Sequence, residues 1–505
     1  MTLVQKNKAI FLDRDGNVIH DKGAIISNEQ VVFYEGVFES LKKLQDAGYL
    51  LFMISNQMCI ATGDATIAEV DAVNDYIDCV LKEHDIVIKD WYICPHHPDD
   101  NCLCRKPKKY FIDKAVAEYN LDLSKSFIIG DHPSDVKTAE FNSMTGLYVL
   151  TGHGAKHLDL LDANELVFHN INTATQWILK HPNSIADLEA EIVEGVERLK
   201  AGEAVALPTE TVYGLGADAF NVDAVKKIFT IKGRPMNNPL IVHVANYEQV
   251  KYLTAEIPDV AKKLMDAFWP GPLTIILPKL DIVPDFVTAN NPTVAIRMPN
   301  NRWALKLIAD ADTPLAAPSA NAFGCTSPTT AEHVENQLQN KCFVIDGGAS
   351  RVGVESTVIT LTEDIPKILR FGGITQEQIA EIIGRVTSGE NKVHRNFESP
   401  GMLAGHYAPN TQLVICEDVE QIKKDFNSND YAIMLLQDDK GIRVKNKIIL
   451  SSEGNLVEAA VNLYSSMRYL DTLNCKKIVT HKFPNYGLGL AINDRLKRAE
   501  TGSKK

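Results

Sequence analysis

Two aspartates close to the N-terminus have the type and spacing needed for phosphoryl transfer. Asp13 and Asp15 follow the apolar run AIFL in FLDRDG, and residues i and i+2 leave the end of a strand on the same side. One carboxylate placed in this way can attack phosphorus while the other donates and then removes a proton. Because a lone pair of aspartates is also typical of a capped turn, the rest of the chain must decide between the two interpretations.

Further polar residues follow later strand-like runs and favour the catalytic interpretation. Ser55 follows LLFMI, Lys106 lies in CRKP, and Asp131 and Asp135 lie in IGDHPSDV after SFII. Together with FLDRDG, this set resembles the haloacid-dehalogenase superfamily of phosphohydrolases. Hard oxygen ligands suit Mg²⁺, and a lysine can neutralise the charge that grows on a transferring phosphoryl group.

The resemblance implies a role for each of these residues. Asp13 would be the nucleophile that forms an aspartyl phosphate, and Asp15 the general acid and base. Ser55 and Lys106 would hold the transferring phosphoryl group. The implied Mg²⁺ ligands are Asp13, the backbone carbonyl of Asp15, Asp131 and Asp135.

A cysteine-rich loop precedes Lys106. Cys94, His96, Cys102 and Cys104 follow the spacing C-x-H-x5-C-x-C, and three thiolates with one imidazole make a closed tetrahedral set for structural zinc. All four lie within a short Pro-, Asp- and Asn-rich loop, which favours a metal site over buried cysteines beside a surface histidine. The zinc loop leads directly into Lys106, so we expect it to brace that lysine.

The zinc loop narrows the resemblance to the histidinol-phosphate and heptose-bisphosphate phosphatases. CPHHP and the later TGHG favour the heptose enzymes, whereas the five-residue gap before Cys102 also occurs in the histidinol enzymes. Asn17 stands where the subfamily usually has Thr, and Thr62 replaces an Arg. The expected substrate is therefore a heptose 1,7-bisphosphate, with histidinol phosphate and a nucleic-acid 3′-phosphate as alternatives.

A second chemical set occupies the stretch 207–243, LPTETVYGLGADAFNVDAVKKIFTIKGRPMNNPLIVH. Two fixed cations beside a small-residue turn are what a polyphosphate site needs, and glycines let the backbone approach a ligand. The polar residues of interest here are Thr211, Lys232, Arg234, Asn238 and His243. Further candidates downstream are Arg297 in AIRMP, Ser319 and Asn321 in PSAN, Ser327 in CTSP, Ser356 and Thr357 in GVESTVI, and Arg370 in ILRFGG.

In order, these strings resemble the YrdC-type family of threonylcarbamoyl-adenylate synthases. The resemblance implies that ATP, L-threonine and bicarbonate give threonylcarbamoyl-AMP and pyrophosphate, and that other proteins use the product to modify tRNA. Such chemistry requires positioning and charge neutralisation rather than a nucleophile. The implied threonine contacts are Thr211, His243, Arg297, Ser356 and Thr357; the implied ATP contacts are Lys232, Arg234, Asn238, Ser319, Asn321, Ser327, Arg370 and Tyr407. Each of these residues alone could have an ordinary structural role. Their occurrence together, in this order along the chain, favours a functional role.

Alternating strand-like and helix-like segments predict how these residues are positioned. We expect an α/β protein with a Rossmann-like phosphatase domain at 1–155, a linker at 156–184 and a YrdC-like twisted-sheet domain at 185–387. An ordered linker at 388–410 would carry Tyr407 as a lid, and 411–505 would form a small Rossmann-like domain, as in long-form synthases. The chain of 505 residues has length for about three domains.

Composition excludes several classes of function. A net charge of −13 disfavours non-specific nucleic-acid binding, so any tRNA contact should be weak and local, and an RNA-binding module without synthase activity is the less favoured alternative. Carbamoyl transfer, as in hydrogenase-maturation proteins, is disfavoured because their accompanying modules have no counterpart here. No signal peptide or membrane helix is evident. Nine cysteines, three of them clustered, suggest a reduced cytoplasmic protein.

Overall fold

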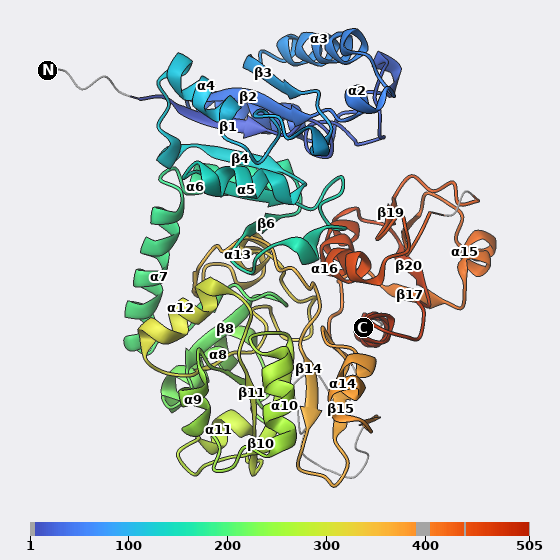
Figure 1. The fold of residues 1–505 in the computed structure, drawn as a ribbon. Helices are drawn as coiled ribbons and strands as arrows, with labels where there is room; N and C mark the ends of the chain where they lie inside the picture. The colour runs from blue at the N-terminus through green and yellow to red at the C-terminus, as the bar shows by residue number, and fades with distance from the viewer. Residues whose placement is uncertain (1–5, 390–404, 439–440, 504–505) are drawn as a thin grey trace, which may run out of the picture. The chain divides into compact units, whose positions relative to one another are not determined.

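The computed structural model describes residues 6–389, 405–438 and 441–503 (Figure 1). The chain divides into two compact units, residues 1–190 and residues 191–505, and each is described by itself. Helix α7 (Ile185–Lys200) crosses the boundary between them. Of the helices in the described ranges, none combines the length and apolar character needed to cross a bilayer.

The first unit is built on a six-stranded sheet that is parallel throughout, in the order β3-β2-β1-β4-β5-β6. Its strands are near-continuous apolar runs, as expected for a sheet covered on both faces. The strands are β1 (Lys8–Leu12), β2 (Tyr49–Asn56), β3 (Ile88–Cys94), β4 (Phe127–Gly130), β5 (Thr145–Val149) and β6 (Leu166–Phe168). The helices are α1 (Val37–Asp46), α2 (Cys59–Thr62), α3 (Ile67–Glu83), α4 (Tyr110–Tyr119), α5 (Pro133–Phe141) and α6 (Ile171–Lys180).

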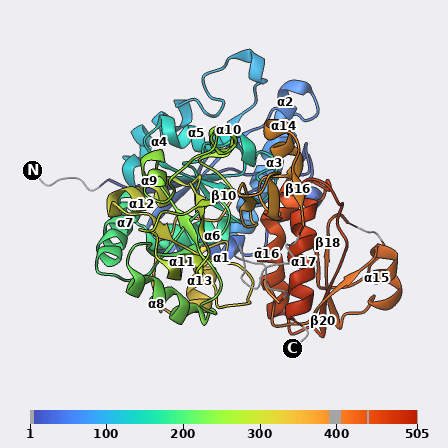
Figure 2. The same ribbon diagram turned by 90° about the horizontal axis from the view of Figure 1, so that it is seen from below.

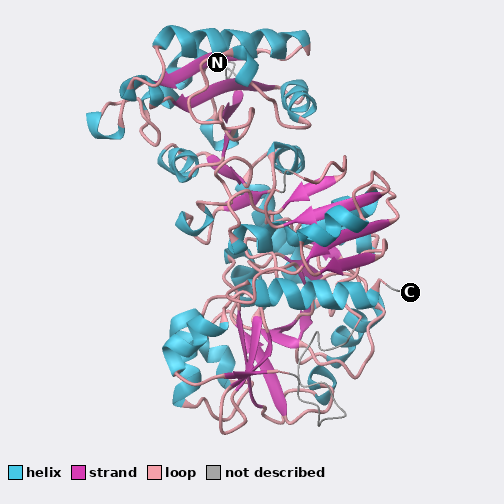
Figure 3. Cartoon of the chain, turned by 90° about the vertical axis from the view of Figure 1, so that its right-hand side faces the viewer, coloured by secondary structure: helices cyan, strands magenta, loops and turns pink. Residues whose placement is uncertain are grey.

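Helices cover both faces of this sheet (Figure 3). Helices α4 and α5 pack on the face that includes Ile128, and Trp177 of α6 packs against neighbouring Phe127, which faces the other way. The strand order reverses direction between β1 and β4, and in open α/β sheets ligands bind at the carboxyl ends of strands beside such a switch point. The Rossmann-like class expected for this unit is confirmed.

The segment 156–184 differs from the expected linker. It contains β6, which is the edge strand of the sheet of the first unit, and α6, which packs on that sheet. The strand has only three residues, LVF, and is followed closely by a short helix. Such a short run gives little periodicity to read in a sequence.

The second unit contains a ten-stranded mixed sheet in the order β13-β7-β8-β12-β9-β11-β10-β14-β15-β16. Its strands are β7 (Val205–Leu207), β8 (Gly214–Asp218), β9 (Ile241–His243), β10 (Leu273–Pro278), β11 (Thr293–Arg297), β12 (Leu315–Ala316), β13 (Phe343–Val344), β14 (Thr357–Thr360), β15 (Lys367–Arg370) and β16 (Thr387–Ser388). Besides α7, its helices are α8 (Val222–Lys232), α9 (Tyr247–Lys251), α10 (Asp259–Phe268), α11 (Asp285–Thr288), α12 (Arg302–Ala311), α13 (Ala331–Leu338) and α14 (Gln376–Ile383). This is the mixed α/β architecture that the sequence predicts.

A smaller lobe, residues 411–505 and called the C-terminal lobe below, completes the second unit. Its parallel sheet has the order β17-β20-β18-β19. Alternate residues of the sheet pack against α16 and α17 on one face and α15 on the other (Figure 2). The elements are β17 (Leu413–Cys416), α15 (Val419–Asp425), β18 (Tyr431–Leu435), β19 (Lys447–Ile449), α16 (Leu456–Thr472), β20 (Lys477–His481) and α17 (Gly489–Gly502).

The C-terminal lobe packs closely on the rest of the second unit. Val212 and Val354 belong to the same apolar cluster as residues of α16 and α17. Gly353 has φ +74, and a Cβ there would lie 2.3 Å from the carbonyl oxygen of Ala460. This contact therefore requires glycine. Most of the expected linker, 390–404, lies outside the described residues.

Two candidate active sites

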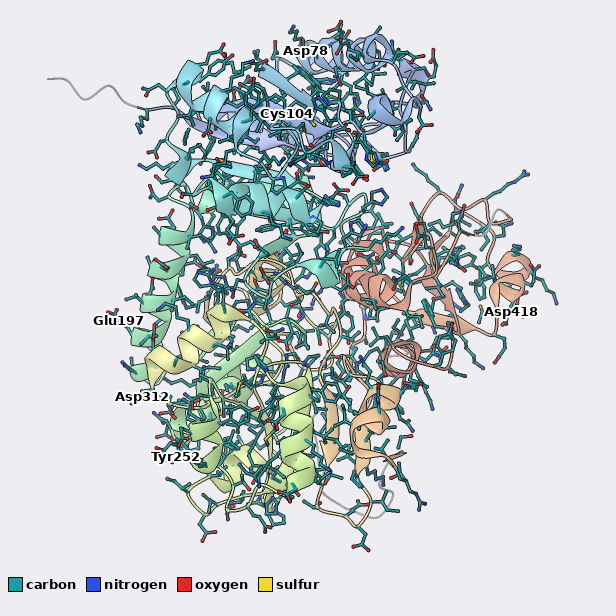
Figure 4. The ribbon with its side chains drawn as sticks, viewed as in Figure 1. Asp78, Cys104, Glu197, Tyr252, Asp312 and Asp418 are labelled. Atoms are coloured by element: carbon teal, nitrogen blue, oxygen red, sulfur yellow. The ribbon has the colours of Figure 1, made fainter. Side chains whose placement is uncertain are left out.

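The first candidate site is a cavity of about 360 Å³ at the carboxyl ends of β1, β2 and β4. Asp13 and Asp131 directly follow β1 and β4, and Ser55 lies near the end of β2. Two further predicted residues line the cavity: Asp15, and Lys106, which follows the cysteine loop, whose Cys104 is labelled in Figure 4. The full lining is Asp13, Asp15, Asp21, Gly23, Ala24, Ser55, Asn56, Gln57, Met58, Cys59, Thr62, Asp64, Arg105, Lys106, Asp131, His132, Ser134 and His153.

A buried lysine binds two of the predicted carboxylates. Lys106 Nζ lies 2.9 Å from Asp13 Oδ1 and 2.6 Å from Asp135 Oδ1, and donates to the carbonyl of Ile54 at 3.0 Å. Burial opposes the charge of Lys106, but the two carboxylates outweigh it and raise its pKa. Burial also raises the pKa of Asp13 to about 6, although Lys106 acts against this rise. Asp13 is thus ionised at neutral pH but strongly desolvated.

Asp15 is held by two side chains that the sequence did not single out. Gln57 Nε2 donates to Asp15 Oδ2 at 2.6 Å, and the buried Arg14 contacts both carboxylate oxygens from Nε at 3.2 and 3.1 Å. Burial raises the pKa of Asp15 in spite of the opposing Arg14. A carboxyl group that keeps its proton more readily is suited to act as a general acid. The only advance signal for Gln57 was its place two residues after Ser55.

Three carboxylates are close enough to share one divalent cation. Oxygens of Asp13, Asp131 and Asp135 lie within 4.8 Å of one another. Asp131 also accepts a hydrogen bond from the His153 backbone N–H at 2.7 Å. A Cβ on Gly16, φ +77, would lie 1.9 Å from Asp131 Oδ2, so only glycine leaves room for this carboxylate. The side chain of Asp15 is outside the group, which agrees with a contact through its backbone carbonyl only.

The four predicted zinc ligands converge. The three sulfurs are separated by 3.6 Å along the pairs Cys94–Cys102 and Cys102–Cys104, and His96 Nδ1 lies 3.7 Å from Cys94 Sγ and 3.3 Å from Cys104 Sγ. Two sulfurs bound to one zinc at about 2.3 Å in tetrahedral geometry are about 3.8 Å apart. The four residues thus fit a zinc ion without rearrangement.

Asn17 and Thr62 are the two positions at which the sequence departs from the phosphatase pattern, and the structure shows what each of them contacts. The buried Asn17 donates from Nδ2 to the carbonyls of Asp13 at 3.2 Å and Ile129 at 3.1 Å, so it joins the ends of β1 and β4. Thr62 lines the cavity, and its hydroxyl donates to Asp64 at 2.6 Å. Asn17 therefore holds the ends of β1 and β4 together. Thr62, by contrast, lies on the cavity wall, where a substrate would contact the protein.

The second candidate site is a small cavity of about 50 Å³ in the second unit. It brings together eight of the predicted synthase residues: Thr211, Arg234, His243, Arg297, Ser319, Ser356, Arg370 and Tyr407. The remaining lining residues are Thr209, Val212, Gly214, Ile241, Ala317, Pro318, Glu355 and His406. Ligand pockets for molecules of drug size are about 300 Å³ or larger, so this cavity is smaller than a site filled by a nucleotide.

Neighbouring strands position the predicted threonine contacts. Parallel pairing of β9 with β11 sets His243 opposite Arg297. Arg297 Nη2 lies 2.7 Å from the buried carboxylate of Glu210, a residue that the sequence did not single out. Burial, with a smaller effect from Arg297, lowers the pKa of His243 to about 3, so this imidazole is neutral. Its Nδ1 is buried without a hydrogen-bond partner and can bond to a ligand.

The predicted ATP contacts surround two buried basic residues, Lys232 and Arg234; burial, together with Arg234, lowers the pKa of Lys232 well below its usual value. Arg234 donates to the carbonyls of Pro239 at 2.9 Å and Asn238 at 3.3 Å, and Lys232 Nζ donates to the carbonyls of Ser319 and Asn321. Burial lowers the pKa of Arg234 to about 9. Both amide atoms of Asn238 are buried without partners. Unpaired buried polar atoms are costly, which is what a site awaiting a polar ligand would show.

Five predicted contacts lie outside the cavity lining: Lys232, Asn238, Asn321, Ser327 and Thr357. Four of them make side-chain hydrogen bonds within the protein: Lys232 as described above, Asn321 through Nδ2 to the carbonyls of Ala322 and Cys325, both at 2.8 Å, and Ser327 and Thr357. Ser327 donates to Glu355 Oε1 at 2.6 Å, and Thr357 accepts from the Ile374 N–H at 3.1 Å. Their contacts with substrate stay predictions.

Tyr407 closes one side of the cleft. It is 1% exposed, has φ +64 and stacks on Tyr464 of α16 at 6.0 Å. The guanidinium of Arg495 lies 5.1 Å from its ring centroid. The neighbouring His406 also lines the cleft and has a buried Nδ1 without a partner. Tyr407 therefore lines the cleft, and its role as a lid stays a prediction; the sequence did not predict His406.

The two sites are a carboxylate-rich cavity in the first unit and a cleft lined by three arginines in the second. Three protein-family models match successive parts of this chain. The HAD-hydrolase-like family model matches residues 103–174. The telomere recombination model, named for Sua5, YciO and YrdC, matches residues 197–372, and the threonylcarbamoyl-AMP synthase C-terminal domain model matches residues 374–501.

Individual relatives identify the families. Threonylcarbamoyl-AMP synthase of Bacillus subtilis is 42% identical over 338 residues, which cover 65% of this chain and 98% of that protein. The crystal structure of Sua5 from P. abyssi complexed with L-threonine is 40% identical with a TM-score of 0.58, covering 62% of this chain and 94% of that one. D-glycero-beta-D-manno-heptose-1,7-bisphosphate 7-phosphatase of Helicobacter pylori is 39% identical over 135 residues, which cover 26% of this chain and 78% of that protein.

This chain belongs to the threonylcarbamoyl-AMP synthase family through its second unit and to the HAD phosphatases through its first. Both expected resemblances are confirmed, and the chain joins two enzymes in one polypeptide.

Proposed function

We propose that the second unit condenses ATP, L-threonine and bicarbonate into L-threonylcarbamoyl-AMP and releases pyrophosphate. The main support is that Arg297, His243 and Thr211 line the same cleft as Arg234. Arg297 would bind the carboxylate of threonine, as guanidinium groups do bidentately. Threonine amine and bicarbonate form a carbamate with loss of water, and a carbamate oxygen attacks the α-phosphorus as pyrophosphate leaves. Arg234 and Lys232 would neutralise the phosphates.

The product would then be used by proteins that modify tRNA. The net charge of −13 gives no general attraction to nucleic acid. The test is pyrophosphate release by the purified protein. It should require all three substrates and fall at least 100-fold in Lys232→Ala. Lys226→Ala, which removes an exposed lysine of the same helix, is the matched control. Pyrophosphate release that does not depend on threonine would refute the proposal.

We infer that the first unit hydrolyses a phosphate monoester, with a heptose 1,7-bisphosphate as the expected substrate. Asp13 would attack phosphorus and form an aspartyl phosphate while Asp15 protonates the leaving oxygen; Asp15 would then activate water to release phosphate. Lys106 and Ser55 would orient the phosphoryl group. Asp13, Asp131 and Asp135 would hold a Mg²⁺ ion, which supplies positive charge to the phosphoryl oxygens.

A substrate screen tests the phosphatase proposal. Heptose 1,7-bisphosphate, histidinol phosphate, nucleotides and a 3′-phosphorylated oligonucleotide would be compared with wild type and Asp13→Asn. Activity that survives in Asp13→Asn would refute the mechanism, and faster hydrolysis of histidinol phosphate than of the bisphosphate would refute the substrate.

We further infer a structural zinc at Cys94, His96, Cys102 and Cys104. We also infer a location in the cytoplasm. The cysteine side chains support both inferences. All nine cysteines, each within the described ranges, are free of disulfides, which suits a reducing compartment, and four ligands at tetrahedral spacing leave no open position for catalysis. Elemental analysis should give one zinc per chain.

A further inference from the structure

A buried carboxylate lies inside the cleft that should bind a triphosphate. Glu355 lines the second cavity and is 5% exposed. A negative charge there opposes the binding of ATP, since like charges in a poorly solvated site repel strongly. The cleft therefore needs a cation to cancel Glu355 before its arginines can attract phosphate.

The C-terminal lobe provides that cation. Arg495 of α17 is fully buried, and its Nε lies 2.6 Å from Glu355 Oε2. Tyr464 of α16 donates from its hydroxyl to the same carboxylate at 3.1 Å. Burial raises the pKa of Glu355, but Arg495 and Arg370 outweigh this effect and lower it to about 2. Glu355 is therefore ionised at every physiological pH and depends on its partners for neutralisation.

The same carboxylate is bonded to the nucleotide side of the cleft. Glu355 Oε1 accepts from Ser327 at 2.6 Å. The next residue, Ser356, accepts from Arg370 Nη2 at its hydroxyl at 3.1 Å and from Arg370 Nε at its carbonyl at 3.1 Å. Arg495 also donates from Nη2 to the carbonyl of Phe371 at 2.9 Å, beside Arg370. One ion pair thus joins the C-terminal lobe to predicted ATP contacts.

We propose that Arg495 and Glu355 are positioning residues that make docking of the C-terminal lobe a condition for tight binding of a polyphosphate in the cleft. With the lobe docked, Glu355 is paired and the cleft presents its arginines. With Arg495 removed, Glu355 loses its ion-pair partner, and its negative charge then competes with phosphate for Arg370. Binding of ATP and docking of the lobe then favour each other by linkage. The proposal rests on the proposed synthase function for the identity of the ligand.

The experiment is a double-substitution cycle read by the Kd for ATP from calorimetry and by pyrophosphate release. Arg495→Met should weaken ATP binding at least tenfold, or about 1.4 kcal/mol. Adding Glu355→Gln removes the unpaired charge, so the double variant should return to within about threefold of the wild-type Kd. A purely structural role for Arg495 would not be rescued in this way.

Two controls separate charge from folding. Lys497→Met removes an exposed cation from the same helix and should leave the Kd for ATP within about twofold. Glu355→Gln alone keeps the shape of the side chain and should retain wild-type affinity or improve it, which gives a test even if Arg495→Met does not fold.

The results that overturn the proposal are definite. They are an unchanged Kd in Arg495→Met, a double variant no tighter than Arg495→Met, an equal loss in Lys497→Met, or a tenfold loss in Glu355→Gln. If wild type binds ATP but makes no threonine-dependent pyrophosphate, the proposed function fails, while the Kd values still decide the role of the ion pair.

Discussion

Asp13→Asn should make the metal-free protein more stable while abolishing phosphatase activity. The pKa of Asp13 in the folded protein is about 6 against an ordinary value of 3.8. Above pH 6 the folded state therefore bears the cost of an ionised, desolvated carboxylate. A difference of about two pKa units corresponds to about 3 kcal/mol.

The sign of the pH dependence follows from the direction of this shift. Because the folded pKa is raised, the folded state binds more protons than the unfolded state between pH 3.8 and 6, and the contribution of Asp13 to stability falls as pH rises through that window. Asparagine carries no charge at any pH. The gain in stability of Asp13→Asn over wild type should therefore be largest above pH 6 and absent below about pH 4.

Differential scanning calorimetry can measure this advantage in the first unit. For a unit of 190 residues, 1 kcal/mol shifts Tm by about 2–4 °C, so Asp13→Asn should raise the Tm of its transition by about 6–12 °C at pH 7.5 without metal. Mg²⁺ favours the ionised carboxylate, so millimolar Mg²⁺ should raise the Tm of wild type more than that of the variant.

A surface aspartate provides the matched control. Asp46 is exposed and pairs with Lys42 on α1, so Asp46→Asn should change Tm by no more than about 2 °C. An equal or lower Tm for metal-free Asp13→Asn at pH 7.5, or the same gain at pH 4 as at pH 7.5, would refute the reasoning.

Three further predictions concern single contacts. Cys102→Ser should lose the zinc found by elemental analysis and lower phosphatase kcat, whereas Cys79→Ser, at an exposed cysteine, should change neither; zinc retained at one per chain would contradict the ligand set. Arg297→Lys should raise KM for threonine by about 30- to 100-fold, because the lysine lacks the guanidinium fork, with KM for ATP changed less than threefold; equal rises in both would argue against a threonine contact. Gln57→Leu removes a hydrogen bond that lowers the pKa of Asp15, so the alkaline limb of the phosphatase kcat profile should move to higher pH, and a shift to lower pH would exclude Asp15 as the general acid.

The sequence predicts the catalytic frame of the first unit well, and the reason is geometric. Asp13 and Asp131 directly follow β1 and β4, and apolar runs that end in polar residues are visible in a single sequence. Parallel pairing then brings these ends together without further information. The zinc ligands are equally visible because all four lie in one loop.

Contacts between distant segments are not predictable in this way. Glu355 and Arg495 are 140 residues apart and form their ion pair only when the C-terminal lobe docks. Glu210 lies next to the predicted Thr211, yet nothing local indicates that it reaches Arg297. In both cases the partner is chosen by tertiary packing, which sequence periodicity does not report.

The two sites accommodate phosphate with opposite balances of charge. In the first cavity Asp13, Asp15 and Asp131 outnumber Lys106, so a phosphate ester can enter favourably only after a divalent cation has bound. In the second, Arg234, Arg297 and Arg370 face the carboxylates of Glu210 and Glu355, and each carboxylate already has an arginine within 2.7 Å. Under the two proposals, the phosphatase would obtain its missing positive charge from solution, whereas the synthase would obtain the cation that pairs with Glu355 from its own C-terminal lobe. Activity in the first unit should depend on the concentration of Mg²⁺ even where ATP binding in the second depends on the position of α17.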